Sequence, residues 1–250
     1  MNAPTTINLT RDEIAARAAQ APDGAAAFQV VTDLLVERYS CRGYRPDPVP
    51  HGTIAQILTA AQLSASWCNA QPWEVIVTEG EGTERFRKAM FERATSGAGG
   101  HKPDFVFPQR YEGVYDQRRK ECGWGLYEAV GVVRGDREGS ARQMFENFRL
   151  FGAPHVLFLT SEAELGTYGA VDCGLYLGNL MLLMQSLGIA SIAQAAFASH
   201  SPFLREYFGI PENRRIVCGL SFGYPDPAHA ANGFRTRRAD VGAVAHWVTE

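Results

Sequence analysis

The spacing of apolar and polar residues along the chain predicts helices that alternate with a few short strands. A helix is expected to begin at Thr10, because Thr10-Arg11-Asp12-Glu13 has the form of a capping box. The later helices follow from apolar residues spaced three or four positions apart. They are expected at about 25–39, 53–66, 81–94, 111–133, 138–150, 171–187 and 202–208.

Four stretches rich in β-branched or other apolar residues predict strands. They lie at 73–78, 154–160, 189–192 and 215–222. The proline-rich run at 46–50 predicts an extended loop, because proline and the residue before it disfavour helix. No repeat of fixed period and no low-complexity linker divides the chain, so the pattern indicates a single α+β domain.

Two of the expected helices carry unusual apolar surface. Phe28, Val31 and Leu35 fall on one face of the helix at 25–39. The helix at 171–187 is apolar nearly all round, which is typical of burial in a core or in a subunit interface. It is interrupted by polar residues and is too short to span a bilayer comfortably.

Composition and charge narrow the possible functions. The chain has 250 residues, of which 46% are hydrophobic, and a net charge of −3, which argues against a basic nucleic-acid binder. The five cysteines form no Cys-x-x-Cys pair and the six histidines lack ligand spacing, so neither a disulfide framework nor a metal site is predicted. The first residues show neither a basic stretch nor an apolar run, so we expect no secretory signal and a cytoplasmic location.

Two basic clusters could grip a phosphate. Arg38-Tyr39-Ser40-Cys41-Arg42 follows an expected helix, and Arg235-Thr236-Arg237-Arg238 lies near the end of the chain. Arginine offers a planar fork of donors that matches phosphate oxygens. The two clusters could converge on one phosphate, or both could be solvated surface, the first of them favoured by the helix dipole.

Two further segments could touch a flat heterocycle. Ser66-Trp67-Cys68-Asn69, followed by Gln71 and Trp73, sets hydroxyl and amide groups between two tryptophans, although a turn with Trp73 packed in the core is equally compatible. Ala193-Gln194-Ala195-Ala196 would let backbone approach a ligand closely, or it could reflect tight packing. Gly219-Leu220-Ser221-Phe222-Gly223 matches the bare pattern of a nucleophile elbow, but Ser221 falls inside an expected strand.

Taken in order, these segments resemble the FMN-dependent nitroreductase family. The resemblance covers roughly 34–241 and includes Phe151-Gly152-Ala153-Pro154 and Leu177-Gly178-Asn179-Leu180. It implies an α+β nitroreductase-like fold, with a central, mostly antiparallel sheet wrapped by helices, in an intertwined homodimer with FMN sites at the interface. Residues 1–30 would be an N-terminal helical extension and 31–250 a single FMN-binding domain. Within it, 95–150 would be a divergent helical insertion and a possible lid.

The resemblance also implies flavin contacts, residue by residue. Arg38, Tyr39 and Ser40 match the phosphate and ribityl contacts, and Arg42 matches a basic residue near the pyrimidine edge. Ser66, Trp67 and Asn69 match a loop that one subunit contributes to the partner's flavin site. Gln194, Ala195 and Ala196 match the segment beside the flavin N5. Arg235 and Arg237 match a C-terminal pair that binds the phosphate. Asp172 is a weaker match near the cofactor.

The activity implied is that of an NAD(P)H-dependent oxidoreductase. It would reduce nitroaromatics or quinones in a ping-pong reaction, by hydride transfer through flavin N5, and no side chain need act as acid or nucleophile. The sequence does not choose between NADH and NADPH. Tyr111, Tyr115 and Trp124 of the insertion could cover the flavin and touch a small aromatic acceptor, or they could be helix core or surface.

Two alternatives stay open at this point. A reductive dehalogenase or heterocycle oxidase of the same fold would need paired charges over its substrate, which 110–121 could supply. A flavin-binding protein without turnover would need the same arginines and Asn69. The segment Ser66-Trp67-Cys68-Asn69 replaces the Ser-Ser-x-Asn of many members and is similar to that of nitrobenzoate reductases.

Overall fold

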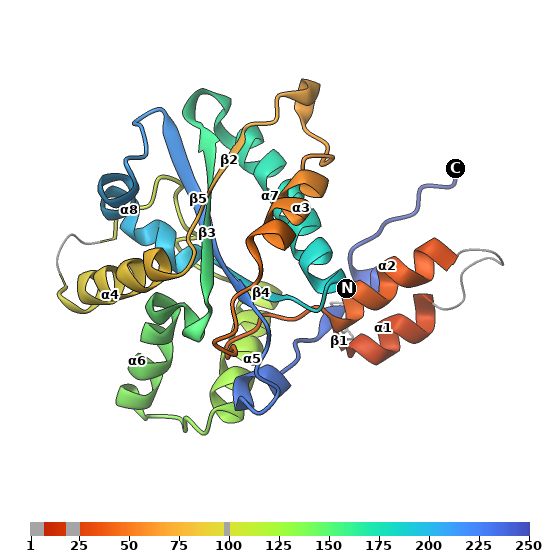
Figure 1. Cartoon of the computed structure of the whole chain (residues 1–250). Coiled ribbons are helices and arrows are strands. Elements are labelled where there is room, and N and C mark those ends of the chain that lie inside the picture. Colours follow the sequence, from red (N-terminus) through yellow and green to blue (C-terminus); the bar gives the residue numbers. More distant parts are fainter. Residues whose placement is uncertain (1–7, 19–25, 98–100) are drawn as a thin grey trace.

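A four-stranded antiparallel sheet forms the centre of the molecule in the computed structural model, which describes residues 8–18, 26–97 and 101–250 (Figure 1). The strands lie in the order β2-β3-β5-β4. Their bounds are β2 (Trp73–Val77), β3 (His155–Glu162), β4 (Ala190–Gln194) and β5 (Arg214–Gly223). The four predicted strands and the antiparallel α+β architecture are therefore confirmed.

A second, two-stranded sheet joins the two ends of the chain. Strand β1 (Asn8–Leu9) pairs antiparallel with β6 (Arg238–Ala239), and Leu9 lies opposite Arg238. No pattern in the sequence predicted this pairing. It sets the N-terminal segment directly against the basic C-terminal cluster.

Eight α-helices surround the sheet in the described part of the chain. They are α1 (Arg11–Ala18), α2 (Ala26–Glu37), α3 (His51–Ala61), α4 (Glu81–Thr95), α5 (Gly113–Ala129), α6 (Arg137–Phe145), α7 (Gly166–Ser186) and α8 (Ser201–Phe208). The capping box is confirmed, because Glu13 accepts from the Thr10 backbone at 2.6 Å while its own N–H donates to the Thr10 hydroxyl at 3.2 Å. Residues 1–7 and 19–25 of the expected extension lie outside the described residues.

Several predicted helix bounds are wrong where tertiary packing overrides the local pattern. Helix α3 ends at Ala61 rather than near 66, and α5 spans less than the predicted 111–133. The helix predicted at 138–150 divides into α6 and a 3₁₀ segment, η2 (Glu146–Gly152). There Leu150 and Phe151 take φ values of 61° and 52°, which brings both side chains into the core.

The core lies on both faces of the sheet. Alternate residues of β3 point to opposite faces, so Leu157 and Leu159 join one cluster and Val156 and Phe158 join the other. Figure 1 shows α3 and α7 on one side of the sheet and α4 and α8 on the other. The two clusters together hold β3 and β5 rigidly in the middle of the domain.

One apolar face remains uncovered in the single chain. Helix α7 buries Cys173, Tyr176, Leu180 and Met184 against the sheet, while Tyr168, Val171 and Leu175 on its other side are exposed. The stripe predicted on α2 is uncovered too, with Phe28, Val31 and Leu35 exposed by 50, 48 and 53%. Among helices in the described residues, none is long and apolar enough to cross a membrane.

Candidate functional site

The segment after α2 runs along the free edge of β4. Ser40 forms a parallel bridge with Ser191, whose carbonyl accepts from the Cys41 backbone at 3.3 Å. Cys41 is fully buried, and its thiol donates to the Gly43 carbonyl at 3.2 Å. The buried Cys41 side chain therefore fixes this segment against β4, and its neighbours Ser40 and Arg42 stay partly accessible at the sheet edge.

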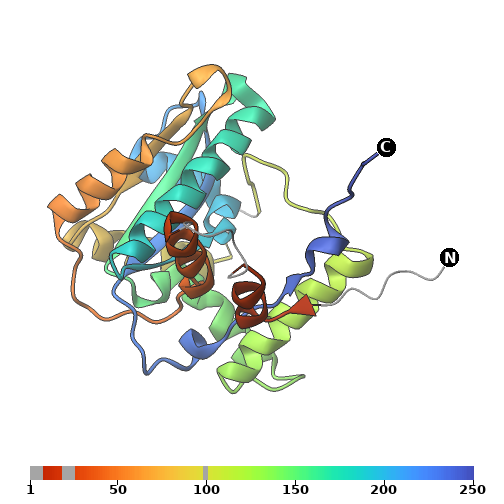
Figure 2. The same cartoon turned by 90° about the vertical axis from the view of Figure 1, so that its right-hand side faces the viewer.

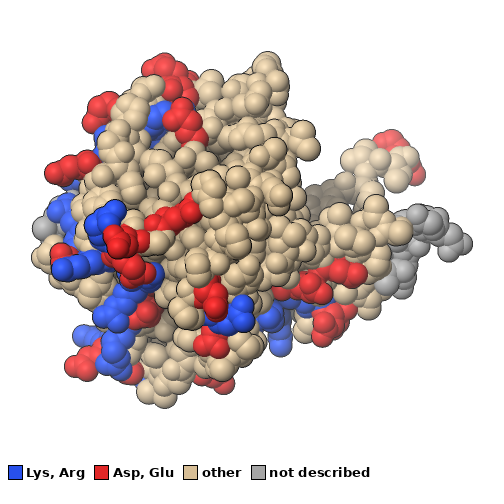
Figure 3. Space-filling view, in the orientation of Figure 1, with Lys and Arg blue, Asp and Glu red and all other residues tan. Residues whose placement is uncertain are grey.

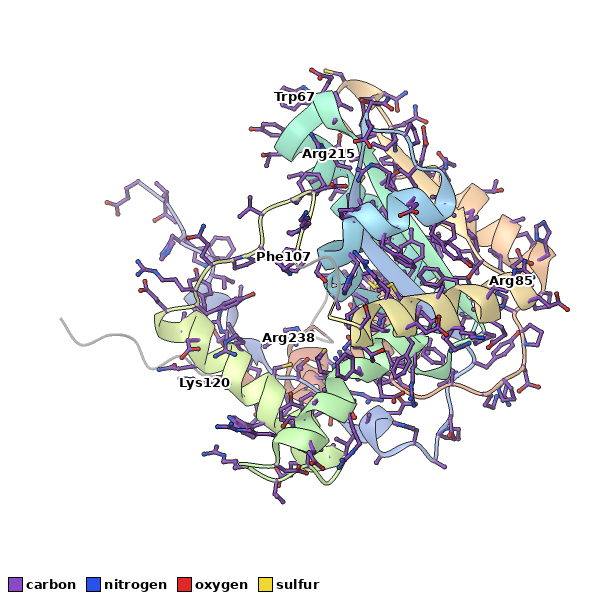
Figure 4. All side chains as sticks on the ribbon, turned by 90° about the vertical axis from the view of Figure 1, so that its left-hand side faces the viewer. Trp67, Arg85, Phe107, Lys120, Arg215 and Arg238 are labelled. Atoms are coloured by element: carbon purple, nitrogen blue, oxygen red, sulfur yellow. The ribbon has the colours of Figure 1, made fainter. Side chains whose placement is uncertain are left out.

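Four arginines from three segments gather beside this edge. Burial and then the charges of Arg238, Arg38 and Arg235 lower the pKa of Arg11 to about 10. Burial, followed by the charge of Arg238, also lowers the pKa of Arg38. Figure 4 shows Arg238 close to α5 and to the N-terminal helices. Guanidinium groups that repel one another at close range form a site that favours an anion.

The arginine side chains of the basic C-terminal cluster point in two directions, Arg235 toward Tyr39 and Arg237 toward α5. The Arg235 guanidinium lies 3.8 Å from the centre of the Tyr39 ring and donates to the Asn232 carbonyl at 2.6 Å. Arg237 is exposed and faces α5, where its Nε lies 3.8 Å from Glu121 Oε1. Arg38, Tyr39 and Arg235 thus lie together, whereas the charge of Arg238 acts on Arg38 and Arg237 pairs with α5.

Sequence reasoning left Arg11 and Arg238 out of the candidate set. Arg238 belongs to a basic cluster that was recognised, but only Arg235 and Arg237 of that cluster were assigned to the flavin. Arg11 stood out only as part of a capping box, and no spacing relates it to a position 27 residues away in sequence. Its place follows from the β1–β6 pairing.

A cavity of about 600 Å³ adjoins the arginines, between α5 and the C-terminal segment. Figure 2 shows these two elements side by side. Its lining combines cationic groups with a few apolar and thiol groups. The residues are Arg118, Glu121, Cys122, Phe234, Arg235, Thr236, Arg237, Arg238, Ala239 and Val244. The Nε of Arg118 is buried and has no hydrogen-bond partner in the described part of the chain.

Arg42 is held in place by Asn232 and Ser40. Its backbone N–H donates to Asn232 Oδ1 at 2.8 Å, and its guanidinium donates to the Ser40 carbonyl at 3.2 Å. Burial lowers the pKa of Arg42. Asn232, which the sequence did not single out, also donates to the Gly43 carbonyl at 2.7 Å and so fixes both sides of this turn.

The end of β4 presents small residues while its polar side chain turns inward. Ala193 and Ala195 are exposed, but Gln194 is buried and donates to the Asn147 carbonyl at 3.0 Å. The side-chain amide oxygen of Gln194, Oε1, accepts from the Ser221 hydroxyl at 2.5 Å. The amide of Gln194 is therefore committed to the core, and Ser221 is a buried strand residue as expected.

The loop after α3 lies away from the arginines. Figure 4 shows Trp67 and Arg238 well apart on one chain. Cys68, Asn69 and Gln71 take left-handed φ values of 51°, 55° and 46°. Three such non-glycine residues within four positions are strained, and strain of this kind clusters at functional sites.

The aromatic residues of the insertion do not converge on the cavity. Tyr111 and Tyr115 are exposed, and neither lines the cavity beside the arginines. Trp124 packs against Tyr127 and lies 4.8 Å from the Arg134 guanidinium carbon, next to a separate cavity of about 310 Å³. Within one chain, these three side chains do not form a common wall.

Several known proteins are similar to this chain. Residues 35–224 match the Nitroreductase family. The chain is 34% identical over 222 residues to nitroreductase NfnB of Mycolicibacterium smegmatis, covering 88% of this chain and 93% of that protein. It is 30% identical to the chloronitrobenzene nitroreductase of Comamonas testosteroni, with 88% and 97% covered. The crystal structure of the FMN-dependent NfnB of Mycobacterium smegmatis with NADPH superposes with a TM-score of 0.83, at 33% identity, over 88% of this chain and 99% of that one.

Proposed function

Because the chain belongs to the nitroreductase family, we propose that it is an FMN-dependent oxidoreductase that uses NADPH or NADH to reduce nitroaromatic compounds. One observation carries the proposal. Half-buried Arg38 gathers with Arg11, Arg235 and Arg238 beside the free edge of β4, where small residues leave room for a flat ring.

The residues at this site fit FMN. In the described ranges 8–18, 26–97 and 101–250, the Arg38 guanidinium makes no hydrogen bond or ion pair, so its donors are available to a phosphate. Arg11 and Arg118 are half-buried, and each keeps a buried Nε without a partner among the described residues. The exposed Ala193 and Ala195 on β4 and η4 (Ala195–His200) would lie under the ring, with the backbone from Gln194 to Ala196 beside it.

Each group then has a stated task. Arg38 and Arg235 would bind the phosphate, Tyr39 and Ser40 would flank the ribityl chain, and the enclosed charge of Arg42 would favour negative charge at the pyrimidine edge. Bound FMN would supply the hydride-transfer chemistry between the nicotinamide and the acceptor, in the two half-reactions of a ping-pong scheme. Quinones belong to the same acceptor class, because they are flat and accept two electrons.

We also propose that the site is completed by a second copy of the chain. The exposed apolar residues of α2 and α7 flank a groove of about 290 Å³ that includes Val31, Leu63 and Leu182. Figure 3 shows a surface nearly free of charge over α3 and the following loop, while charged groups gather over α4 and α8. Covering such a face in a homodimer would remove it from water and carry Ser66, Trp67 and Asn69 to the partner's flavin.

The remaining parts of the chain have proposed places in this scheme. Residues 31–250 would form the flavin-binding domain, and 1–30 would extend it. The insertion at 95–150 would border the flavin through α5 and could bring Tyr111, Tyr115 or Trp124 to the acceptor in the dimer.

The experiment is a flavin titration of the purified protein with three variants. Flavin fluorescence quenching reports FMN binding, and the Kd should rise more than tenfold in Arg38→Ala and in Arg235→Ala, because a hydrogen bond to a charged group contributes about 1.5–3 kcal/mol. Arg85→Ala is the matched control, since Arg85 is an exposed residue of α4 that Figure 4 shows far from Arg238. A wild-type chain that binds no FMN would refute the proposal.

Turnover is then measured on the loaded protein. Anaerobic mixing with NADPH or NADH should bleach the flavin absorbance, and a nitrobenzoate should restore it. Binding of FMN without bleaching by either nucleotide would identify a flavin-binding protein without turnover. Faster turnover of an iodotyrosine than of the nitrobenzoate would instead identify a reductive dehalogenase.

A further inference from the structure

We propose that Arg11 is a positioning residue for the phosphate-binding arginines, and that docking of the segment 8–18 and binding of an anion stabilise one another. The juxtaposition of α1, the end of α2 and the C-terminal strand β6 carries this inference. It rests on the proposed function, because FMN is taken as the anion. The segment 8–18 lies outside the residues 35–224 that match the family.

Arg11 ties the start of α1 to the end of α2. Its Nη1 donates to the backbone carbonyls of Val36 and Arg38. The last carbonyls of a helix have no partner within the helix, and a cation there also complements the helix dipole. Arg11 therefore fixes the point at which the chain leaves α2, and with it the direction in which Arg38 departs.

The same segment also holds the other wall of the site. Leu9 is buried and lies opposite Arg238 in the β1–β6 pair. The capping box of Thr10 and Glu13 fixes the turn between this strand and α1, so Leu9 and Arg11 act through one short rigid piece. A chain without it would lose contacts to both arginine-bearing segments.

Electrostatics couples this docking to the anion. Docking brings the Arg11 guanidinium close to those of Arg38, Arg235 and Arg238, and the resulting repulsion contributes to the lowered pKa of Arg11. A phosphate dianion bound among the four guanidinium groups attracts each of them, and this attraction outweighs their mutual repulsion. Coupling between two binding events is reciprocal, so the anion should favour the docked segment as much as the docked segment favours the anion.

The first test compares FMN with riboflavin, which lacks the phosphate. In Arg11→Ala we expect the FMN Kd to rise about tenfold, as for the loss of a charged hydrogen bond, and the riboflavin Kd to change less than twofold. Asp12→Ala, an exposed neighbour in the same helix, is the control for general effects on α1. An equal change for both flavins, or no change for either, would overturn the inference while leaving the proposed function standing.

The second test uses the wild-type chain and needs no variant to fold. Limited trypsin digestion, followed by mass spectrometry, measures the rate of cleavage after Arg11 in the presence of FMN, riboflavin or inorganic phosphate. FMN should slow this cleavage at least fivefold, and riboflavin should not. Salt at 0.5 M should weaken the protection, because screening shortens the range over which charges interact. Equal protection by FMN and riboflavin would refute the coupling, whereas absence of any FMN binding would refute the proposed function with it.

Discussion

Both carboxylate oxygens of Asp172 accept a hydrogen bond from the backbone N–H of Trp67, each at 3.2 Å. Asp172 is buried in α7, and one turn earlier the Tyr168 ring packs edge-on against Trp67 with centroids 4.4 Å apart. Further along, Asn179 donates to the Ser64 hydroxyl at 2.8 Å. Helix α7 therefore holds the segment that leads into the strained residues, at Ser64 and again at Trp67, and in the single chain Asp172 supports this loop.

Replacement of Asp172 tests this support. Asp172→Ala leaves the Trp67 N–H without its acceptor, so the free energy of unfolding should fall by about 1–3 kcal/mol. Asp172→Asn keeps one acceptor oxygen, so its free energy of unfolding should fall clearly less than that of Asp172→Ala. Urea unfolding followed by tryptophan fluorescence measures both, and an equal loss in the two variants would show that the hydrogen bond is not what stabilises the loop.

A bulky residue at Gly174 tests the proposed dimer. A Cβ at Gly174 would meet no atom within 4 Å in the single chain, and this position lies on the exposed side of α7. Gly174→Leu should therefore leave the fold of one chain intact but clash with a partner packed against α7, so light scattering should give half the wild-type mass.

Gly82→Leu on α4 is the control for that experiment, because it too has open space around its Cβ. It should retain the mass of the wild-type assembly. An unchanged mass for Gly174→Leu would place the partner on another face of the chain.

The stability of the protein should depend on pH through His155. The ring stacks on Phe222 with centroids 5.1 Å apart, and its Nε2 accepts from the Val49 backbone at 2.9 Å, which leaves Nδ1 to donate to the Thr78 carbonyl at 3.1 Å. The bond from Val49 needs the neutral ring, because a protonated Nε2 cannot accept, and burial lowers the pKa of His155. Below its ordinary pKa of about 6.5, the unfolded chain binds a proton that the folded chain does not.

The direction of the pH dependence follows from this difference in proton binding between the unfolded and the folded chain. The stabilising contribution is complete above about pH 6.5 and is lost as the pH falls, with a slope of at most about 1.4 kcal/mol per pH unit. Burial also lowers the pKa of His200, so the comparison is made against His155→Gln. Unfolding in urea between pH 7.5 and 5 should show a flatter dependence in the variant, and identical slopes would contradict the assignment.

Gly219 tests the packing between the sheet and η4. A Cβ there would lie 2.5 Å from Phe197 Cδ2 and 3.2 Å from Phe158 Cε1, and both rings are fully buried. Gly219→Ala should lower the free energy of unfolding by about 1–3 kcal/mol, because the packed core cannot yield. Gly123→Ala in α5 has open space and should instead stabilise the protein by about 0.5–1 kcal/mol, as alanine does in a helix interior. Thermal unfolding separates the two results.

Much of the fold could be predicted from local pattern, because the forces that start a helix or form a strand act over a few neighbouring residues. The capping box at Thr10, the four strands and the basic clusters at Arg38 and Arg235 are examples. The apolar stripe of α2 was also visible in the sequence. That it remains exposed could not be predicted, since periodicity reveals a face that needs cover but not whether the same chain covers it.

The composition of the site depended on contacts between distant segments. Arg11 meets Arg38 and Arg238 because β1 pairs with β6 across almost the whole chain, and local preferences say nothing about such a closure. Arg237 faces Glu121 while its neighbour Arg238 reaches Arg38, and Gln194 turns inward to Ser221. The sequence therefore identifies which residue types can bind an anion, but their directions are set by the partners that the folded chain brings within hydrogen-bonding distance.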